Sequence, residues 1–229
     1  MAKGIIYCMT TIVPGLIKIG KTGSSNFDQR MYTLEHNGYS NVVGLKRNFA
    51  IEVEDYDEKE EIIHNIFSKS RVGDTELFAV DINLVVQLLS SMEGKQVYPI
   101  DKPKEVVFDE ATDSRTIDCV PDGIYYFDYK PHHSGKEYKA KLRKKDGILY
   151  LCKDSQVNTE RNDIVVKSWY DLRNSEIIKS GVVVKDIVCD SLSMAGALVK
   201  GYQANGWEVW KTEDGKRLDI FRRKIENNK

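Results

Sequence analysis

The sequence predicts two small domains of the α/β or α+β class, each with a short sheet and helices packed on it. Residues 1–95 alternate short apolar runs with segments of helical apolar spacing, and the order β-β-α-β-α-β-α indicates a mixed or antiparallel sheet. Residues 96–120 lose this pattern and carry two prolines among charged residues, as a linker does. Residues 121–229 combine aromatic-rich runs with an Asp-Gly turn signal, which predicts a second small α+β domain.

Two predicted strands open the chain. Gly4–Met9 is a compact apolar run with β-branched residues, and Leu16–Gly20 alternates apolar residues with others after a Pro-Gly turn. Strands joined in this way form a hairpin. We expect that hairpin to bring Tyr7, Lys18 and Lys21 close together.

The next segment, residues 26–37, has the apolar spacing of a helix. Phe27, Met31 and Leu34 recur at i, i+4 and i+7, so they share one face. Arg30 lies about 60° from that stripe, on its rim. A guanidinium held there is well shaped to bind a phosphate.

Two further strands and two further helices complete the first domain. They are a strand over 42–53, a helix that Asp55 begins with Glu58 completing a capping box, a strand over 76–80 and a helix capped by Asp81. The predicted buried face of the first of these helices consists of Ile62, Ile63, Ile66 and Phe67. His64 falls off that face, so periodicity alone predicts a surface histidine.

The rest of the chain is predicted in the same way. The linker contains one short strand, over 105–108, and the second domain starts with a strand over 123–129. Strands over 137–145 and 148–153 flank Asp146-Gly147, a strong hairpin signal. The remaining predicted elements are a helix over 164–181, a strand over 182–189 and a short helix capped by Ser191.

Four cations alternate along the first strand of that hairpin: Lys139, Lys141, Arg143 and Lys145. Alternation in a strand places them on one face. A solvated strand face is the common explanation of such a pattern. Because almost no acidic residues lie between them, we predict instead a stripe that faces the phosphates of a nucleic acid.

Bulk composition narrows the class of protein. The net charge is −1, but residues 1–95 hold 10 Lys and Arg against 13 Asp and Glu, whereas residues 121–229 hold 21 against 16. Positive charge is therefore concentrated in the second half. The four cysteines are far apart, which supports neither a zinc site nor a disulfide framework. No signal peptide or long apolar span appears, so we expect a cytoplasmic protein without a membrane partner.

The first hundred residues resemble the GIY-YIG nucleases, in the branch whose second motif reads K-I-G-K-T. Ile5-Ile6-Tyr7 corresponds to the first motif and Lys18-Ile19-Gly20 to the second, with ten residues between Tyr7 and Lys18. The helix arginine and a late glutamate follow in the order that the family has. The chain departs from the superfamily at Lys18, where a second tyrosine is usual.

That resemblance implies roles for single residues. Arg30 is the family's helix arginine, and Glu76 is its metal-binding glutamate, which would hold one Mg²⁺ or Mn²⁺ ion. Tyr7 is the implied general base, and Lys18 and Lys21 are the nearby cations that would favour its phenolate. The branch often carries a histidine at the position of His64, so His64 belongs either to the site or to the surface.

The last hundred residues carry a second resemblance. Ser191-Leu192-Ser193-Met194-Ala195 and the tail Asn205–Lys211 are similar to a domain of unknown function fused behind GIY-YIG nucleases, and to the restriction enzyme adenine methylase associated (RAMA) domain. Leu192 replaces the usual proline. DNA binding is proposed for RAMA domains, which makes Ser193, Asn205, Trp207 and Trp210 candidates for that role. Core filling explains at least one tryptophan, and the other is available to stack on a base.

The main hypothesis is a metal-dependent DNA endonuclease, in which Arg30 neutralises the phosphate, Glu76 holds the ion and Tyr7 activates water. Each residue also has an ordinary structural explanation: Tyr7 as a strand aromatic, Arg30 in an ion pair with Glu35 or Asp28, and Glu76 on a strand surface. The alternative function is a binding module that Lys18 has made inactive. DNA, which could carry modified bases, is the expected partner in both.

Overall fold

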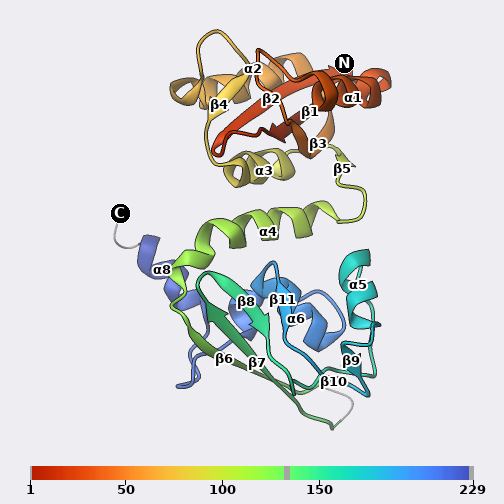
Figure 1. The fold of residues 1–229 in the computed structure, drawn as a ribbon, viewed down its shortest axis with the longest axis vertical. Helices are drawn as coiled ribbons and strands as arrows, with labels where there is room; N and C mark the ends of the chain where they lie inside the picture. Colours follow the sequence, from red (N-terminus) through yellow and green to blue (C-terminus); the bar gives the residue numbers. More distant parts are fainter. Residues whose placement is uncertain (1, 132–134, 227–229) are drawn as a thin grey trace. The chain divides into compact units, whose positions relative to one another are not determined.

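The structure, a computed structural model, describes residues 2–131 and 135–226 (Figure 1). The chain divides into two compact units, Met1–Thr112 (unit 1) and Asp113–Lys229 (unit 2). Both units mix antiparallel sheets with helices, which confirms the predicted fold class. In the described ranges no helix has the length and apolar character needed to cross a membrane.

Unit 1 is built on a five-stranded sheet with the order β4-β2-β1-β3-β5. Every pairing in it is antiparallel, which decides between the two predicted sheet types. The strands are β1 (Lys3–Thr10), β2 (Leu16–Gly23), β3 (Lys46–Glu54), β4 (Leu77–Ala79) and β5 (Lys95–Tyr98). The helices are α1 (Phe27–Asn37), α2 (Tyr56–Ile66) and α3 (Ile82–Ser91), with short 3-10 turns at Ser24–Asn26 and Ser68–Ser70. Helix α4 (Lys104–Thr116) begins in unit 1 and ends in unit 2.

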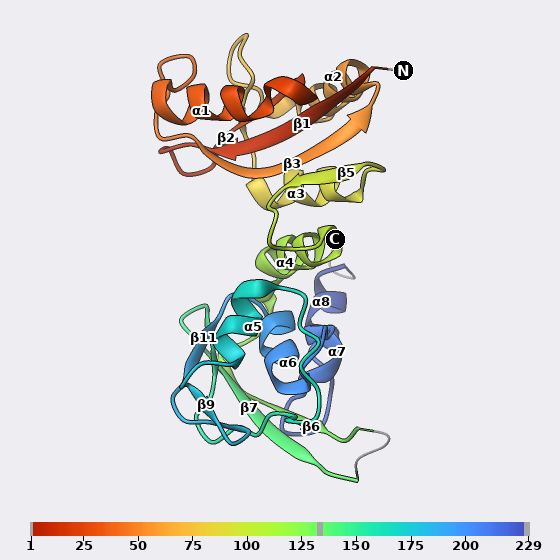
Figure 2. The same ribbon diagram turned by 90° about the vertical axis from the view of Figure 1, so that its right-hand side faces the viewer.

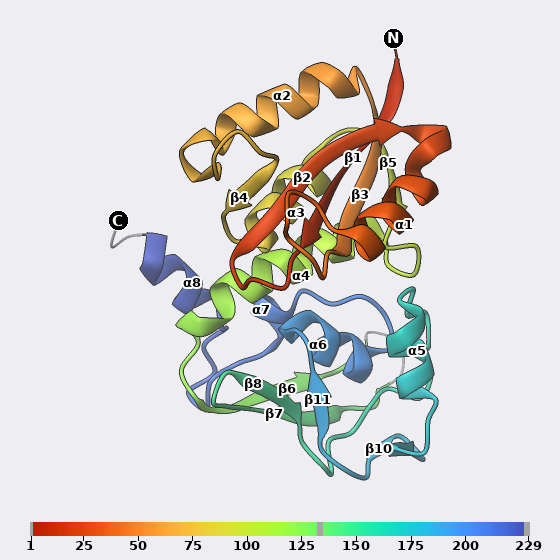
Figure 3. The same ribbon diagram turned by 45° about the horizontal axis from the view of Figure 1, so that its top comes forward.

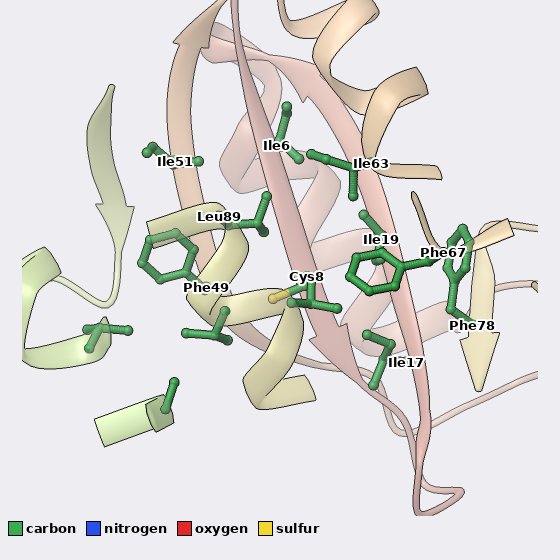
Figure 4. Packing of buried hydrophobic residues seen from close by; sticks show 14 of the residues in the cluster. Ile6, Cys8, Ile17, Ile19, Phe49, Ile51, Ile63, Phe67, Phe78 and Leu89 are labelled. Atoms are coloured by element: carbon green, nitrogen blue, oxygen red, sulfur yellow. The ribbon is translucent and has the colours of Figure 1, made fainter. Parts of the chain in front are cut away.

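Apolar side chains cover both faces of this sheet. On one face Tyr7 and Met9 of β1 pack against Met31 and Leu34 of α1. On the other face α2 and α3 cover β1, β2 and β3 (Figure 3). The cluster there includes Ile6, Cys8, Ile17, Ile19, Phe49, Ile51, Ile63, Phe67, Phe78 and Leu89 (Figure 4). The alternation of β1 therefore sends Tyr7 towards α1 and its neighbours towards α2 and α3.

Helix α2 differs from its prediction. Asp55 has a left-handed backbone (φ 51°) and no side-chain capping bond, so the predicted capping box is wrong. Ile62 and Ile66 are 50% and 57% exposed, and they too were wrongly placed in the core. The reason is Glu60, which pairs with Lys21 of β2 and turns its own side of the helix towards the sheet.

The stretch predicted as a linker contains a helix. Its predicted strand over 105–108 is wrong, because α4 runs through these residues. Val107 and Ala111, four residues apart, belong to the core of unit 1. That i, i+4 spacing is the helical signal that the short apolar run concealed.

Unit 2 contains a four-stranded antiparallel sheet, order β11-β8-β7-β6, with α6 packed on one face (Figure 2). Asp146 and Gly147 both have positive φ, 52° and 78°, as a two-residue hairpin turn requires, so the predicted hairpin is confirmed. The Ser191 hydroxyl accepts a bond from the Met194 amide, as predicted for an N-cap. The elements are η3 (Ile117–Cys119), β6 (Gly123–Tyr129), β7 (Tyr138–Lys145), β8 (Ile148–Leu151), α5 (Lys167–Arg173), β9 (Ile178–Lys179), β10 (Val182–Val183), β11 (Ile187–Cys189), α6 (Leu192–Lys200), α7 (Gly206–Val209) and α8 (Asp219–Glu226).

The predicted helix over 164–181 is mostly wrong. Only α5 is helical, and the small hairpin of β9 and β10 follows it. Ser180 and Gly181 have φ of 50° and 78°, which no helix interior accommodates. The predicted strand over 182–189 is likewise interrupted between β10 and β11. All four cysteines are unpaired, as the sequence indicated.

Candidate functional site

Tyr7 and Arg30 meet on the α1 side of the unit 1 sheet. Tyr7 comes from the middle of β1 and is only 1% exposed. Arg30, on the rim of α1, donates from Nε to the Tyr7 hydroxyl at 3.3 Å. The sequence also allowed a purely structural ion pair between Arg30 and Glu35. That pair is not formed, because Glu35 pairs instead with Arg47 at 2.8 Å. The guanidinium is thus directed at the phenol of the first motif.

Lys18 and Glu76 form the second half of the site. Lys18, on β2, is fully buried, and its ammonium donates to the Glu76 carboxylate. Glu76 directly precedes β4 and accepts a backbone bond from Ile19 at 3.1 Å, which fixes it beside β2. Its side chain is 32% exposed. The lysine that replaces a second tyrosine therefore supplies the counter-charge of the predicted metal ligand.

Gly20 makes the convergence possible. A Cβ at this position would lie 2.9 Å from the Tyr7 hydroxyl and 3.0 Å from Lys18 Nζ. Both groups therefore reach over the same glycine. The third position of the K-I-G motif is therefore a glycine for a steric reason: a side chain there would collide with both groups.

Tyr39 is a member of the site that the sequence did not reveal. Its ring lies under Lys18, with Nζ 3.9 Å from the centroid, and its hydroxyl accepts a bond from the Glu76 amide at 3.3 Å. The sequence signal is only an aromatic residue after Gly38, the positive-φ residue that ends α1. We call Tyr7, Lys18, Arg30, Tyr39 and Glu76 the Tyr7 cluster.

Lys21 does not join this cluster, so the predicted proximity of Lys21 to Tyr7 is wrong. Successive residues of a strand point to opposite faces, and Lys21 lies on the face opposite Lys18. It pairs there with Asp57 at 2.9 Å and Glu60 at 3.0 Å. An odd spacing from Lys18 within one strand already implied this separation.

His64 is partly buried rather than on the surface. Its Nε2 lies 3.2 Å from the Ile19 carbonyl oxygen and 3.8 Å from the Glu60 carboxylate. Its ring contacts Phe78 at 4.9 Å between centroids. His64 thus contacts the backbone of the K-I-G motif from the α2 side.

Burial shifts the pKa values of two members of the Tyr7 cluster, Tyr7 and Lys18. It raises the pKa of the Tyr7 phenol to about 12, although the hydrogen bond and charge of Arg30 act in the opposite direction. Burial also lowers the pKa of Lys18, while Glu76 opposes that shift. The expected effect of Lys18 and Lys21, a phenolate favoured by two cations, is therefore not what this environment produces.

The potential metal ligands are few. Among the described residues no group of three or more His, Cys, Asp or Glu is placed to hold a metal ion. In the Tyr7 cluster the one carboxylate is that of Glu76. A single carboxylate suits Mg²⁺, which keeps several waters and takes further ligands from substrate phosphates.

The four cations of β7 lie along one face of the unit 2 sheet, as predicted. Lys139, Lys141 and Lys145 are exposed, and their neighbours along the strand are buried. Arg143 is half-buried and pairs with Asp186 at 2.8 Å. Three of the four side chains are thus open to a ligand.

Of the four residues predicted from the tail motif, three are buried and Asn205 is exposed. Trp207 and Trp210 are 3% and 0% exposed, and their indole N–H groups donate to the Asp113 carboxylate and the Leu192 carbonyl. Core filling, predicted for at least one tryptophan, accounts for both, so the prediction that the other stacks on a base is wrong. Ser193 is buried against Asp113, and Asn205 caps α7 by accepting from the Trp207 amide.

Comparison with known proteins agrees with the division of the chain into two parts. Residues 4–93 match the family described as the T5orf172 domain, and residues 132–222 match a domain of unknown function (DUF4357). Neither the curated proteins nor the solved structures contain a significant match to the chain. The T5orf172 domain is associated with endonuclease-like function. Each half of the chain thus contains a region that is similar to a known family, the T5orf172 domain in the first half and DUF4357 in the second.

Proposed function

We propose that the chain is a metal-dependent DNA endonuclease of the GIY-YIG type, in which the Tyr7 cluster hydrolyses a phosphodiester bond. The observation that carries this proposal is the convergence of a phenol, a guanidinium, an ammonium and a carboxylate from four separate segments. Hydrolysis needs those functions at one phosphate: a base, charge neutralisation and help for the leaving oxygen. Singly each residue has a structural explanation, but their convergence has none that we find.

Arg30 binds the scissile phosphate in this mechanism. Its Nε is engaged with Tyr7, and no described residue accepts a hydrogen bond from its two terminal nitrogens. Those two nitrogens form a fork suited to two phosphate oxygens. The same guanidinium therefore connects the phosphate to the phenol.

Tyr7 is the general base and takes a proton from the attacking water. With a pKa of about 12, roughly one phenol in 100,000 is ionised at pH 7. The low population is compensated by the strength of such a base. Arg30 and the charge brought by the bound ion both favour the phenolate.

Glu76 would hold the ion together with substrate oxygens and water. When bound, Mg²⁺ would supply a positive charge at the leaving oxygen. In the structure the Lys18 ammonium donates a hydrogen bond to one oxygen of the Glu76 carboxylate. When the ion binds, Lys18 and the ion would have to share this carboxylate. The Lys18 ammonium then remains beside the phosphate as a second fixed cation.

The Lys18–Glu76 pair also favours the alternative function, a nucleic-acid-binding module without catalysis. An ammonium that already neutralises the carboxylate performs the electrostatic part of the ion's role. Binding would then persist while cutting is lost. The two functions differ in one measurable outcome.

The test incubates supercoiled plasmid with the full chain in Mg²⁺, Mn²⁺ or EDTA and measures nicking beside a gel shift. Arg30→Ala and Glu76→Ala should each reduce nicking about a hundredfold or more. Arg47→Ala is the matched control, since Arg47 is a similarly buried arginine paired with Glu35. Full nicking by both site variants contradicts the mechanism, and binding without nicking by the native chain establishes the module.

Unit 2 would deliver the DNA. We propose that the exposed cations of β7 contact phosphates, since their charge is directed outward from one sheet face. The affinity should then fall steeply with salt. Localisation in the cytoplasm and recognition of modified bases stay predictions.

A further inference from the structure

The two faces of the unit 2 sheet differ sharply. One face is buried under α6 and holds Phe127, Leu142 and Leu149. On the other, which we call the open face, large apolar side chains are uncovered. Ile124, Ile148 and Val188 are 50%, 44% and 57% exposed there, on three different strands. About half of the surface of each of these side chains is therefore accessible in the described part of unit 2.

Strand register sets the pattern of the open face. Val188, Tyr150, Arg143 and Ile124 form one row across all four strands. In the adjacent row Tyr126 of β6 stands opposite Lys141. Side chains directly opposite in an antiparallel sheet lie about 5 Å apart. A tyrosine therefore flanks the line of cations on either side.

Positive charge prevails on the open face. The outward positions of β6, β7, β8 and β11 carry one acidic residue, Asp128, and Asp186 beside β11 adds a second carboxylate, against the four cations of β7. Arg143 is held by Asp186 and lies over the Tyr150 ring, 5.0 Å from its centroid. Lys139, Lys141 and Lys145 form no ion pair with any described residue. The face is complementary to a polyanion that also offers apolar surface.

We propose that the open face binds an unpaired segment of nucleic acid, with bases stacked on Tyr126 and on the Tyr150–Arg143 pair and phosphates on the β7 lysines. This rests on the proposed function only in taking nucleic acid as the ligand. Aromatic rings and guanidinium planes in a basic groove are the usual means of holding single strands. A duplex presents phosphates and base edges, so Ile124, Ile148 and Val188 would gain nothing from it. The inference therefore names the substrate as single-stranded or locally melted.

The test measures binding of the full chain to a fluorescein-labelled 20-nucleotide single strand, as DNA and as RNA, and to the duplex of the same length. EDTA is present throughout, so metal-dependent cutting plays no part in the binding assay. If the chain fails to cut DNA in the nicking assay, the binding result still stands on its own. We expect the single strand to bind more tightly than the duplex. Equal or tighter binding of the duplex, or no binding of either, overturns the proposal.

Variants separate stacking from charge. Tyr126→Ala and Tyr150→Ala should each weaken single-strand binding about tenfold, whereas Tyr126→Phe, which keeps the ring, should bind as the native chain does. Tyr170→Ala is the matched control, because Tyr170 is 42% exposed on α5. If both alanine variants bind like that control, the rings do not stack and the proposal fails.

The lysines give an independent readout. Lys139→Ala/Lys141→Ala should lower the slope of log affinity against log salt by about 1.4, the value for two phosphate contacts on a single strand. The control Lys167→Ala/Lys179→Ala removes two exposed lysines that pair with Asp171 and Glu176. An equal change of slope in the control would show that only net charge matters. It would overturn the proposal that the β7 lysines contact the phosphates. A thermal melt of each variant confirms the fold.

Discussion

The two units place their cations in opposite environments. In unit 1 Lys18 is fully buried, bonded to Glu76 and supported by the ring of Tyr39. In unit 2 Lys139 and Lys141 stand exposed and are not paired within the described residues. Buried charge is expensive to bring out of water and is retained only with partners. Exposed charge costs little and is screened by salt.

The difference separates two tasks. Chemistry at a phosphate requires charges already fixed at a few atoms, because preorganised groups need no rearrangement as the reaction proceeds. Holding a flexible strand requires only a surface that many conformations can contact. The burial pattern of the two units suits this division, and the following experiments can break or sharpen it.

The largest expected effect is that of pH on cleavage. Tyr7 must lose its proton to act as a base, and its pKa is about 12. The active fraction, and with it the single-turnover nicking rate, should rise about tenfold per pH unit between pH 6 and 9. Gel shifts at each pH serve as the control, since binding needs no proton transfer and should change far less. A rate that is flat across this range would remove Tyr7 from the role of base.

Gly20→Ala should come next. The new Cβ would crowd the Tyr7 hydroxyl and Lys18 Nζ, so both must shift, and we expect nicking to fall about tenfold to a hundredfold. Gly23→Ala, in the same strand, is the control, because its Cβ meets only Asn26 Nδ2, at 3.9 Å. Equal activity of the two variants would show that the convergence over Gly20 is not required.

The buried ion pair should be visible in stability. Glu76→Gln leaves the Lys18 ammonium buried without a counter-charge, and because Glu76 itself is partly exposed we expect a loss of about 2 kcal/mol. Adding Lys18→Met removes the stranded charge and should recover most of that loss. Urea denaturation of the single and double variants measures both. A double variant less stable than the Glu76→Gln variant would contradict this account.

The smallest effect should be that of the surface pair in unit 2. Asp186→Asn breaks its bond to Arg143, in which both side chains are more than a third exposed, and should cost about 0.5 kcal/mol. The same denaturation curves measure it. If Asp186→Asn lost as much free energy of unfolding as Glu76→Gln, the buried and the exposed ion pair would not differ in stability, which would contradict the comparison of the two units.

Local signals predicted local structure well. The β1–β2 hairpin, α1, the Asp146-Gly147 turn and the Ser191 cap each follow from a few adjacent residues. The failures were α2, α4 and the segment after α5. Each depends on a partner distant in sequence or on a turn, such as Ser180-Gly181, that interrupts an apolar run.

The site divides in the same way. Tyr7, Lys18, Arg30 and Glu76 were predicted from motif order, and the structure brings them together. Tyr39 was missed because no spacing rule connects it to Lys18 or Glu76. Of Trp207 and Trp210 one was predicted in the core, and the other was misjudged because the sequence does not show that both rings are buried.

By itself the sequence determined the residue types, the strand periodicity and the turns, because these depend on neighbours within a few positions. It therefore determined that the β7 cations share a face, and that Tyr7 lies on the opposite face of its strand from Ile6 and Cys8. Only the tertiary structure decided the partners: Lys18 on Glu76, Lys21 on Glu60, and two tryptophans inside the core. Burial and pairing depend on packing between distant segments, and that packing sets which charges can reach a ligand.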